Sequence, residues 1–138
     1  MIVVDTNVLA YLFLPGRHTG AAARALARDP DWLAPRLWRS ELRSVLAQYL
    51  RAKHLTLPDA LAVMDEAAGV LAGGEHEVGS RAVFLLVASS RCSAYDCEFV
   101  ALARAAGVPL VTVDREILRA FPETAVALEE FAAHEEGL

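Results

Sequence analysis

The stretch Ile-Val-Val-Asp-Thr-Asn, residues 2–7, decides how the chain folds. Its first three residues are β-branched or aliphatic without polar interruption, which predicts a short strand buried on both faces of a parallel sheet. The run stops at Asp5, and a helical pattern of apolar residues follows from Val8 to Phe13. Ligands of open α/β sheets bind where the strands end at their carboxyl edge. Asp5 is therefore either the cap of the next helix or a catalytic group.

Short apolar runs and helical patterns alternate along the rest of the chain. Further strands are predicted at 31–34, 75–78, 108–113 and 125–128, and further helices at 18–28, 36–53, 56–71, 83–90, 93–107 and 114–121, before an acidic tail at 129–138. Pro35 is expected in the first turn of the helix that follows it, and Thr56 with Asp59 forms a capping box. The alternation, without repeats or linkers, predicts one three-layer α/β domain over residues 1–138 with a central parallel sheet.

Composition limits the location of the protein. No apolar run approaches the ~20 residues of a membrane span, and the apolar N-terminus is broken by Asp5 and carries no basic leader, so no signal peptide is expected. Cys92 and Cys97 have no partners at zinc-like spacing and are expected to be free thiols in a reducing compartment. These features predict a cytoplasmic protein.

The charge is unevenly distributed. The formal net charge of −5 argues against a general nucleic-acid coat protein. Between Arg17 and Lys53, however, the chain has eight basic and three acidic residues, whereas from His54 onward it has fourteen acidic residues and five arginines. This asymmetry favours a basic surface for polyanions on an acidic body, or simply solvated helix faces.

Four acidic residues occupy unusual positions. Asp5 and Asp114 each follow a predicted buried strand, and Asp96 lies at the start of a helix, in Ser-Ala-Tyr-Asp. Glu41 falls inside the apolar face of its own predicted helix, at ~100° per residue. An unpartnered glutamate facing the core costs several kcal/mol in desolvation, so Glu41 should border a cleft, meet a cation or change protonation.

Helix capping is the competing explanation for the three aspartates, because Asp is a preferred N-cap worth ~1 kcal/mol. Capping does not explain Glu41. Three acids at one sheet edge and a fourth aimed inward would repel each other without a cation, and so many carboxylate oxygens suit Mg²⁺ or Mn²⁺. Small polar residues, Thr6, Asn7 and Thr112, lie at the same predicted strand ends.

These motifs together resemble the PIN domain family. The resemblance rests on Val-Val-Asp-Thr-Asn-Val-Leu at the N-terminus, Glu41 within residues 37–46, Ala-Tyr-Asp ending at Asp96, and Val-Thr-Val-Asp ending at Asp114. It covers essentially the whole chain, is most specific over residues 94–118, and is closer still to the VapC-type toxin ribonucleases of bacterial toxin–antitoxin pairs. The helix that carries Glu41 departs from it, with Ser44 where many relatives carry asparagine.

The resemblance implies a PIN fold and a Mg²⁺- or Mn²⁺-dependent endoribonuclease that hydrolyses RNA with a metal-activated water. Carried over by motif, the acidic quartet that binds metal and catalyses would be Asp5, Glu41, Asp96 and Asp114, with Thr6, Asn7 and Thr112 as supporting polar residues. The family acts on RNA, is silenced by a small antitoxin protein and commonly forms homodimers. Arginines beside Glu41 could contact RNA phosphates or acidic residues of an antitoxin or second subunit: Arg36, Arg39 and Arg43.

Three other functions stay open. An RNA-processing PIN nuclease would lack an antitoxin. A phosphoryl-transfer α/β protein would use Asp5 as its nucleophile; phosphatases of the haloacid-dehalogenase type have Asp-x-Asp there, but Asn7 stands at the second position and Lys53, the chain's single lysine, has no strand-end context. A binding module would have kept the fold and lost the chemistry, which the intact quartet disfavours.

Overall fold

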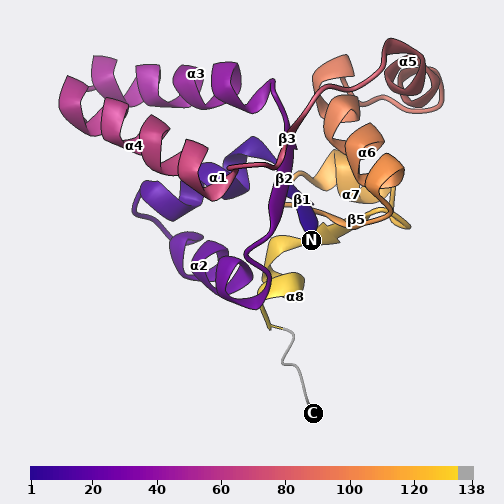
Figure 1. The fold of residues 1–138 in the computed structure, drawn as a ribbon, viewed down its shortest axis with the longest axis horizontal. Helices are drawn as coiled ribbons and strands as arrows, with labels where there is room; N and C mark the ends of the chain where they lie inside the picture. The colour runs from indigo at the N-terminus through magenta and orange to yellow at the C-terminus, as the bar shows by residue number, and fades with distance from the viewer. Residues whose placement is uncertain (134–138) are drawn as a thin grey trace.

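The computed structural model describes residues 1–133; residues 134–138, the end of the predicted acidic tail, lie outside the described part. Five parallel strands form one sheet in the order β3-β2-β1-β4-β5 (Figure 1). The strands are β1 (Ile2–Val4), β2 (Trp32–Pro35), β3 (Glu75–His76), β4 (Leu110–Thr112) and β5 (Ala125–Ala127). The predicted α/β class with a central parallel sheet is confirmed.

Strand β1 lies at the centre of the sheet because its residues can be buried on both faces. Ile2, Val3 and Val4 are at most 1% exposed. Val3 pairs with Leu33 of β2 on one side and with Leu110 of β4 on the other. The chain therefore leaves β1 at Asp5 in the middle of the carboxyl edge, beside the end of β4.

Helices cover both faces of the sheet (Figure 1). Helix α6 (Ala94–Ala106) packs against β1, β2 and β4 and carries α5 (Ser80–Ala88) on its outer side. The opposite group begins with α1 (Thr6–Phe13), which contacts α2 (Thr19–Arg28) and α3 (Trp38–Arg51). Three further helices complete the described chain: α4 (Leu57–Val70) on α3, α7 (Arg115–Ala120) beside β5, and α8 (Leu128–Ala133) on α2.

The local capping signals place several helix ends correctly. Thr56 and Asp59 form the predicted capping box of α4, and Gly107 ends α6 with φ 68°, a left-handed conformation that glycine adopts without strain. Cys92 and Cys97 are buried free cysteines. Within residues 1–133, no helix combines the length and apolarity that crossing a membrane requires.

The predicted position of Pro35 is wrong. Pro35 does not open a helix: it ends β2 opposite His76, and α3 begins only at Trp38, because Arg36 N donates to His76 O (3.2 Å) and prolongs the extended chain. The first residues of the predicted acidic tail supply most of α8. Arg28 of α2 stabilises this helix by donating to Phe131 O (2.8 Å) while its guanidinium lies 4.0 Å from the Phe131 ring centroid.

Candidate functional site

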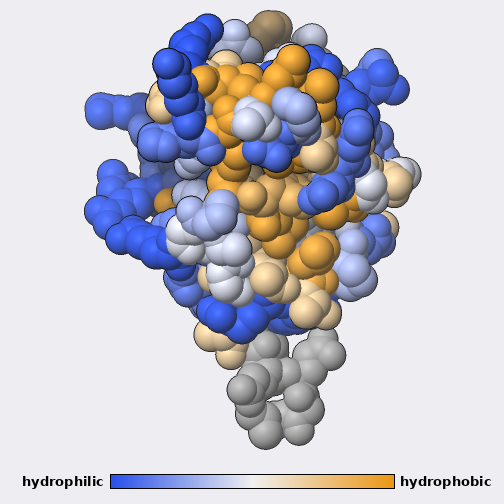
Figure 2. Space-filling model, turned by 90° about the vertical axis from the view of Figure 1, so that its left-hand side faces the viewer, coloured by the Kyte–Doolittle hydropathy of each residue, from blue (hydrophilic) through white to orange (hydrophobic). Residues whose placement is uncertain are grey.

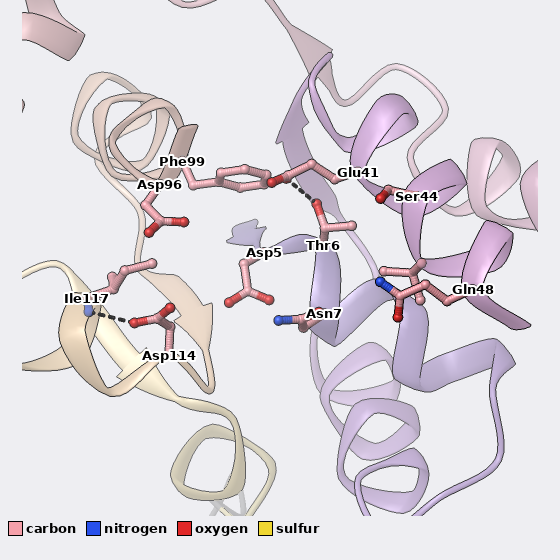
Figure 3. Close-up of a pocket in the computed structure, with 11 residues that line it drawn as sticks. Asp5, Thr6, Asn7, Glu41, Ser44, Gln48, Asp96, Phe99, Asp114 and Ile117 are labelled. Atoms are coloured by element: carbon pink, nitrogen blue, oxygen red, sulfur yellow. Dashed lines mark hydrogen bonds between the residues drawn. The ribbon is translucent and has the colours of Figure 1, made fainter. Parts of the chain in front are cut away.

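A cavity of about 230 Å³ opens at the carboxyl edge of β1 and β4 (Figure 3). The four predicted acids all line it, although they come from the end of β1, the first turn of α3, the first turn of α6 and the start of α7. The other lining residues are Thr6, Asn7, Ser44, Val45, Gln48, Phe99 and Ile117.

Asp5 is both a helix cap and a cavity residue. As the N-cap of α1, its Oδ1 accepts a hydrogen bond from Val8 N (3.0 Å), and its Oδ2 accepts one from the Thr112 hydroxyl. Burial is the main cause that raises the pKa of Asp5, these two bonds lower it, and the charge of Asp114 raises it, so that the pKa is about 6. The site therefore favours the protonated form of Asp5 up to a higher pH than water does.

Asp114 and Asp96 face Asp5 from one side (Figure 3). Asp114 caps α7, where its Oδ1 accepts from Glu116 N (2.9 Å) and Ile117 N (3.0 Å). Asp96 N donates to Ser93 Oγ (3.0 Å), so the N-cap of α6 fixes the backbone that carries this carboxylate. Burial, and then the charge of Asp114, raises the pKa of Asp96.

Thr112 links two of the carboxylate positions from inside the sheet. Its side chain is fully buried, its hydroxyl donates to Asp5, and the same oxygen accepts from Asp114 N (3.0 Å). Thr112 thus orients both the carboxylate of Asp5 and the backbone of Asp114, although it does not line the cavity itself.

Glu41 lies in the first turn of α3, where its half-buried side chain lines the cavity. Its Oε1 accepts a hydrogen bond from Thr6 Oγ1 (2.8 Å), which gives this acid a partner. Burial is the main cause that raises the pKa of Glu41, the Thr6 bond lowers it, and the charge of Asp96 raises it again. Of the three outcomes expected for an inward glutamate, the structure shows that Glu41 borders a cleft.

The carboxylates converge on the cavity without closing into a ligand set. Asp5 lies centrally, with Asp96 and Asp114 on one side and Asn7 and Gln48 on the other (Figure 3). Within residues 1–133, no three His, Cys, Asp or Glu side chains form a group that could hold a metal ion as they stand. The carboxylates that line the cavity nevertheless offer oxygen donors, the type that hard cations prefer.

Two polar residues besides the predicted ones line the cavity: Gln48, which no motif indicated, and Ser44, the departure from the family pattern. Ser44 and Gln48 lie on α3 three and seven residues after Glu41, on the same side of the helix. A polar residue at i+3 and i+7 from an inward glutamate is the signal that could have found them.

The three predicted arginines do not line the cavity. Arg39 forms an ion pair with Glu75 (Nη2 to Oε1, 2.5 Å), which joins α3 to β3. Arg36 is exposed with its Nε 4.0 Å from Glu77 Oε1, and Arg43 is exposed on α3. Arg39 therefore has an intramolecular partner, while Arg36 and Arg43 stay accessible from solvent.

Comparison with known proteins identifies similar chains. Residues 2–123 match the family model described as the PIN domain. Among solved structures, the chain is similar to the crystal structure of VapC20 from Mycobacterium tuberculosis, described as a sarcin–ricin loop cleaving toxin. The TM-score is 0.64 at 20% sequence identity, over 87% of this chain and 95% of that one. No curated protein sequence matches.

Proposed function

Because the chain belongs to the PIN domain family, we propose that it is a metal-dependent endoribonuclease that hydrolyses RNA phosphodiester bonds. The observation that carries this proposal is the convergence of Asp5, Glu41, Asp96 and Asp114, from four separate elements, on one cavity at the carboxyl edge of the sheet. Capping accounts for Asp5 and Asp114, but it does not account for Glu41 and Asp96 facing the same space.

The donor chemistry supports Mg²⁺ or Mn²⁺ as the cofactor, since hard cations prefer carboxylate oxygens. Asp5, Asp96 and Asp114 would hold the cation, with Glu41 completing the site. Such a cation, when bound, activates water and neutralises charge that develops on the phosphodiester. Thr112 and Thr6 would keep Asp5 and Glu41 oriented through their hydrogen bonds, and Asn7 would supply a further polar group at the cavity wall.

The similarity to VapC20 supports the proposal that this chain is the toxin of a toxin–antitoxin pair. Its substrate would be a structured RNA that takes part in translation, in the cytoplasm. An antitoxin and a second copy of the chain both require exposed apolar surface. Apolar side chains gather on the side of the molecule where α3 ends and α4 begins (Figure 2). The first turns of α4 carry Leu57 and Leu61, which are 62% and 57% exposed. Phe84 on α5 and Tyr95 on α6 are also exposed apolar side chains, at 65% and 62%.

The decisive experiment is RNA cleavage by the purified protein with Mn²⁺ and with EDTA. We expect cleavage with Mn²⁺, none in EDTA, and a loss of about 100-fold or more in Asp5→Asn, a range typical for loss of a group that stabilises a transition state. Asp65→Asn, which removes an exposed carboxylate of α4, should cleave like the wild type. Equal activity in EDTA, or an active Asp5→Asn variant, would contradict the proposal.

Two observations test the proposed partners. A small adjacent gene whose product co-purifies with the chain and suppresses cleavage would support the toxin, whereas its absence would favour an RNA-processing PIN nuclease. We also propose that the chain forms a homodimer. Light scattering on the isolated chain distinguishes monomer from homodimer, and a monomer would contradict this proposal.

A further inference from the structure

A second cavity, of about 330 Å³, adjoins the candidate site. The two cavities share three wall residues, Asn7, Val45 and Gln48. In Figure 3, Asn7 and Gln48 lie on the side of Asp5 away from Asp96 and Asp114. The second cavity therefore continues the first one outward between α1 and α3.

Aromatic rings from two helices line this second cavity: Tyr11 of α1 and Tyr49 of α3. Tyr11 packs against His18, with ring centroids 4.6 Å apart and an interplanar angle of 31°. Leu14 and Pro15 add further apolar surface. Its lining thus differs from that of the acidic cavity and suits a flat, partly apolar ligand.

Arg17, an exposed residue that lines the second cavity, supplies a positive charge there. Arg17 Nε donates to His18 Nε2 (3.2 Å), and His18 Nδ1 lies 3.5 Å from Glu129 Oε1. The hydrogen bond to His18 therefore holds the Arg17 guanidinium at the wall of the cavity, which both residues line. No Arg or Lys is among the described residues that line the acidic cavity, whereas Arg17 lines the adjoining one. Arg17 therefore offers an RNA strand a cation beside the carboxylates.

We propose that the second cavity binds the nucleotide next to the scissile phosphate, with its base against Tyr11 and Tyr49 and its backbone phosphate at Arg17. This inference rests on the proposed ribonuclease function. Aromatic faces combined with a cation are the means by which proteins bind unpaired nucleotides, because every base has a face that stacks on an aromatic ring.

Size and position favour a nucleotide over a peptide segment. The volume lies near the lower end of small-ligand sites, which span roughly 300–1,000 Å³, so it suits one nucleotide rather than an extended chain. The shared wall at Asn7 and Gln48 places the ligand one step from the carboxylates, as a strand cleaved there requires.

The test is the cleavage of a random-sequence RNA pool with Mn²⁺, followed by sequencing of the cut ends. We expect the wild type to show only a modest preference, for the bases that stack most strongly, at one fixed position beside the cut. Tyr11→Leu, which keeps an apolar side chain but removes the ring, should raise KM about fivefold or more with little change in kcat and should weaken that preference. Tyr11→Phe keeps the ring and should retain both.

Arg17→Ala should raise KM about threefold or more without altering the base preference, because a phosphate contact carries no sequence information. Arg24→Ala removes an equal charge from an exposed position of α2 that does not line the cavity, and it should behave like the wild type. Thermal melts by circular dichroism check that each variant folds. If Tyr11→Leu does not fold, Tyr49→Leu carries the same expectation.

The outcomes separate this inference from the proposed function. If the wild type leaves the pool uncut with Mn²⁺, the ribonuclease proposal fails. If the wild type cleaves and Tyr11→Leu keeps the wild-type base preference and KM, the proposed nucleotide site is wrong, and the cavity would instead bind a protein partner.

Discussion

Asp5 should make the metal-free protein less stable at neutral pH than in mild acid. Its pKa rises from 3.8 to about 6 on folding, mainly because the carboxyl group is buried. The folded state therefore binds the proton more tightly than the unfolded chain, and stability falls as pH rises from about 4 to 6. Each pKa unit corresponds to about 1.4 kcal/mol, so the full loss is about 3 kcal/mol.

Between pH 5.0 and 7.5 the expected part of this loss is about 1 to 2 kcal/mol, since the rest occurs below pH 5. Burial raises the pKa of Glu41, Asp96 and Glu98 as well, which adds to the loss. Glu75 makes the folded state more stable as pH rises, because Arg39 lowers its pKa. This gain in stability is reached by about pH 5, so it does not mask the loss expected between pH 5.0 and 7.5.

The assay is urea unfolding in EDTA at constant ionic strength, followed by the fluorescence of Trp32 and Trp38, which are both buried. Wild type should lose about 1 to 2 kcal/mol more than Asp5→Asn between pH 5.0 and 7.5, and Asp65→Asn should follow the wild type. Adding Mn²⁺ at pH 7.5 should stabilise the wild type, by about 2.7 kcal/mol at 100 times its Kd. Identical pH slopes for wild type and Asp5→Asn would refute the reasoning.

Two further variants test other contacts. Thr6→Val removes the donor that lowers the pKa of Glu41, so the acid limb of the pH–rate profile should move to higher pH, while Thr6→Ser should leave it in place; an unmoved limb in Thr6→Val would show that the bond to Glu41 does not matter for cleavage. Gly74→Ala would set a Cβ atom against Trp32 O, far inside van der Waals contact, and force β2 and β3 apart. We expect a loss of about 1–3 kcal/mol in the free energy of unfolding by urea. Gly69→Ala, in α4 with nothing within 4 Å, should not be destabilised, and equal stability of the two variants would contradict the clash.

Much of the fold follows from short-range sequence signals. The run Ile2–Val4 predicts a central strand because aliphatic residues without polar interruption are stable only when both faces of the strand are covered. Thr56 and Asp59 set the start of α4 through their own side chains, and Gly107 ends α6 through its backbone freedom. Each of these signals depends on neighbours within a few residues, which the sequence displays directly.

The failures arose where a distant segment overrides the local pattern. Pro35 remains extended because β3, some forty residues later, pairs with it. Helix α8 forms at an apparent acidic tail because α2 supplies the contacts of Arg28 to Phe131. Similarly, Arg39 is paired with Glu75 across the gap between α3 and β3, a contact that its position in the helix does not indicate.

The candidate site divides in the same way. Local patterns identify which acids are unusual, because strand ends, helix starts and an apolar helix face are visible in the sequence at Asp5, Asp114, Asp96 and Glu41. That these acids share a cavity, that Thr112 holds Asp5, and that a second cavity with Tyr11 and Tyr49 adjoins it follow from the packing of the whole chain. Secondary structure and capping depend on nearby residues, whereas the meeting of side chains depends on how segments far apart in the chain pack against one sheet.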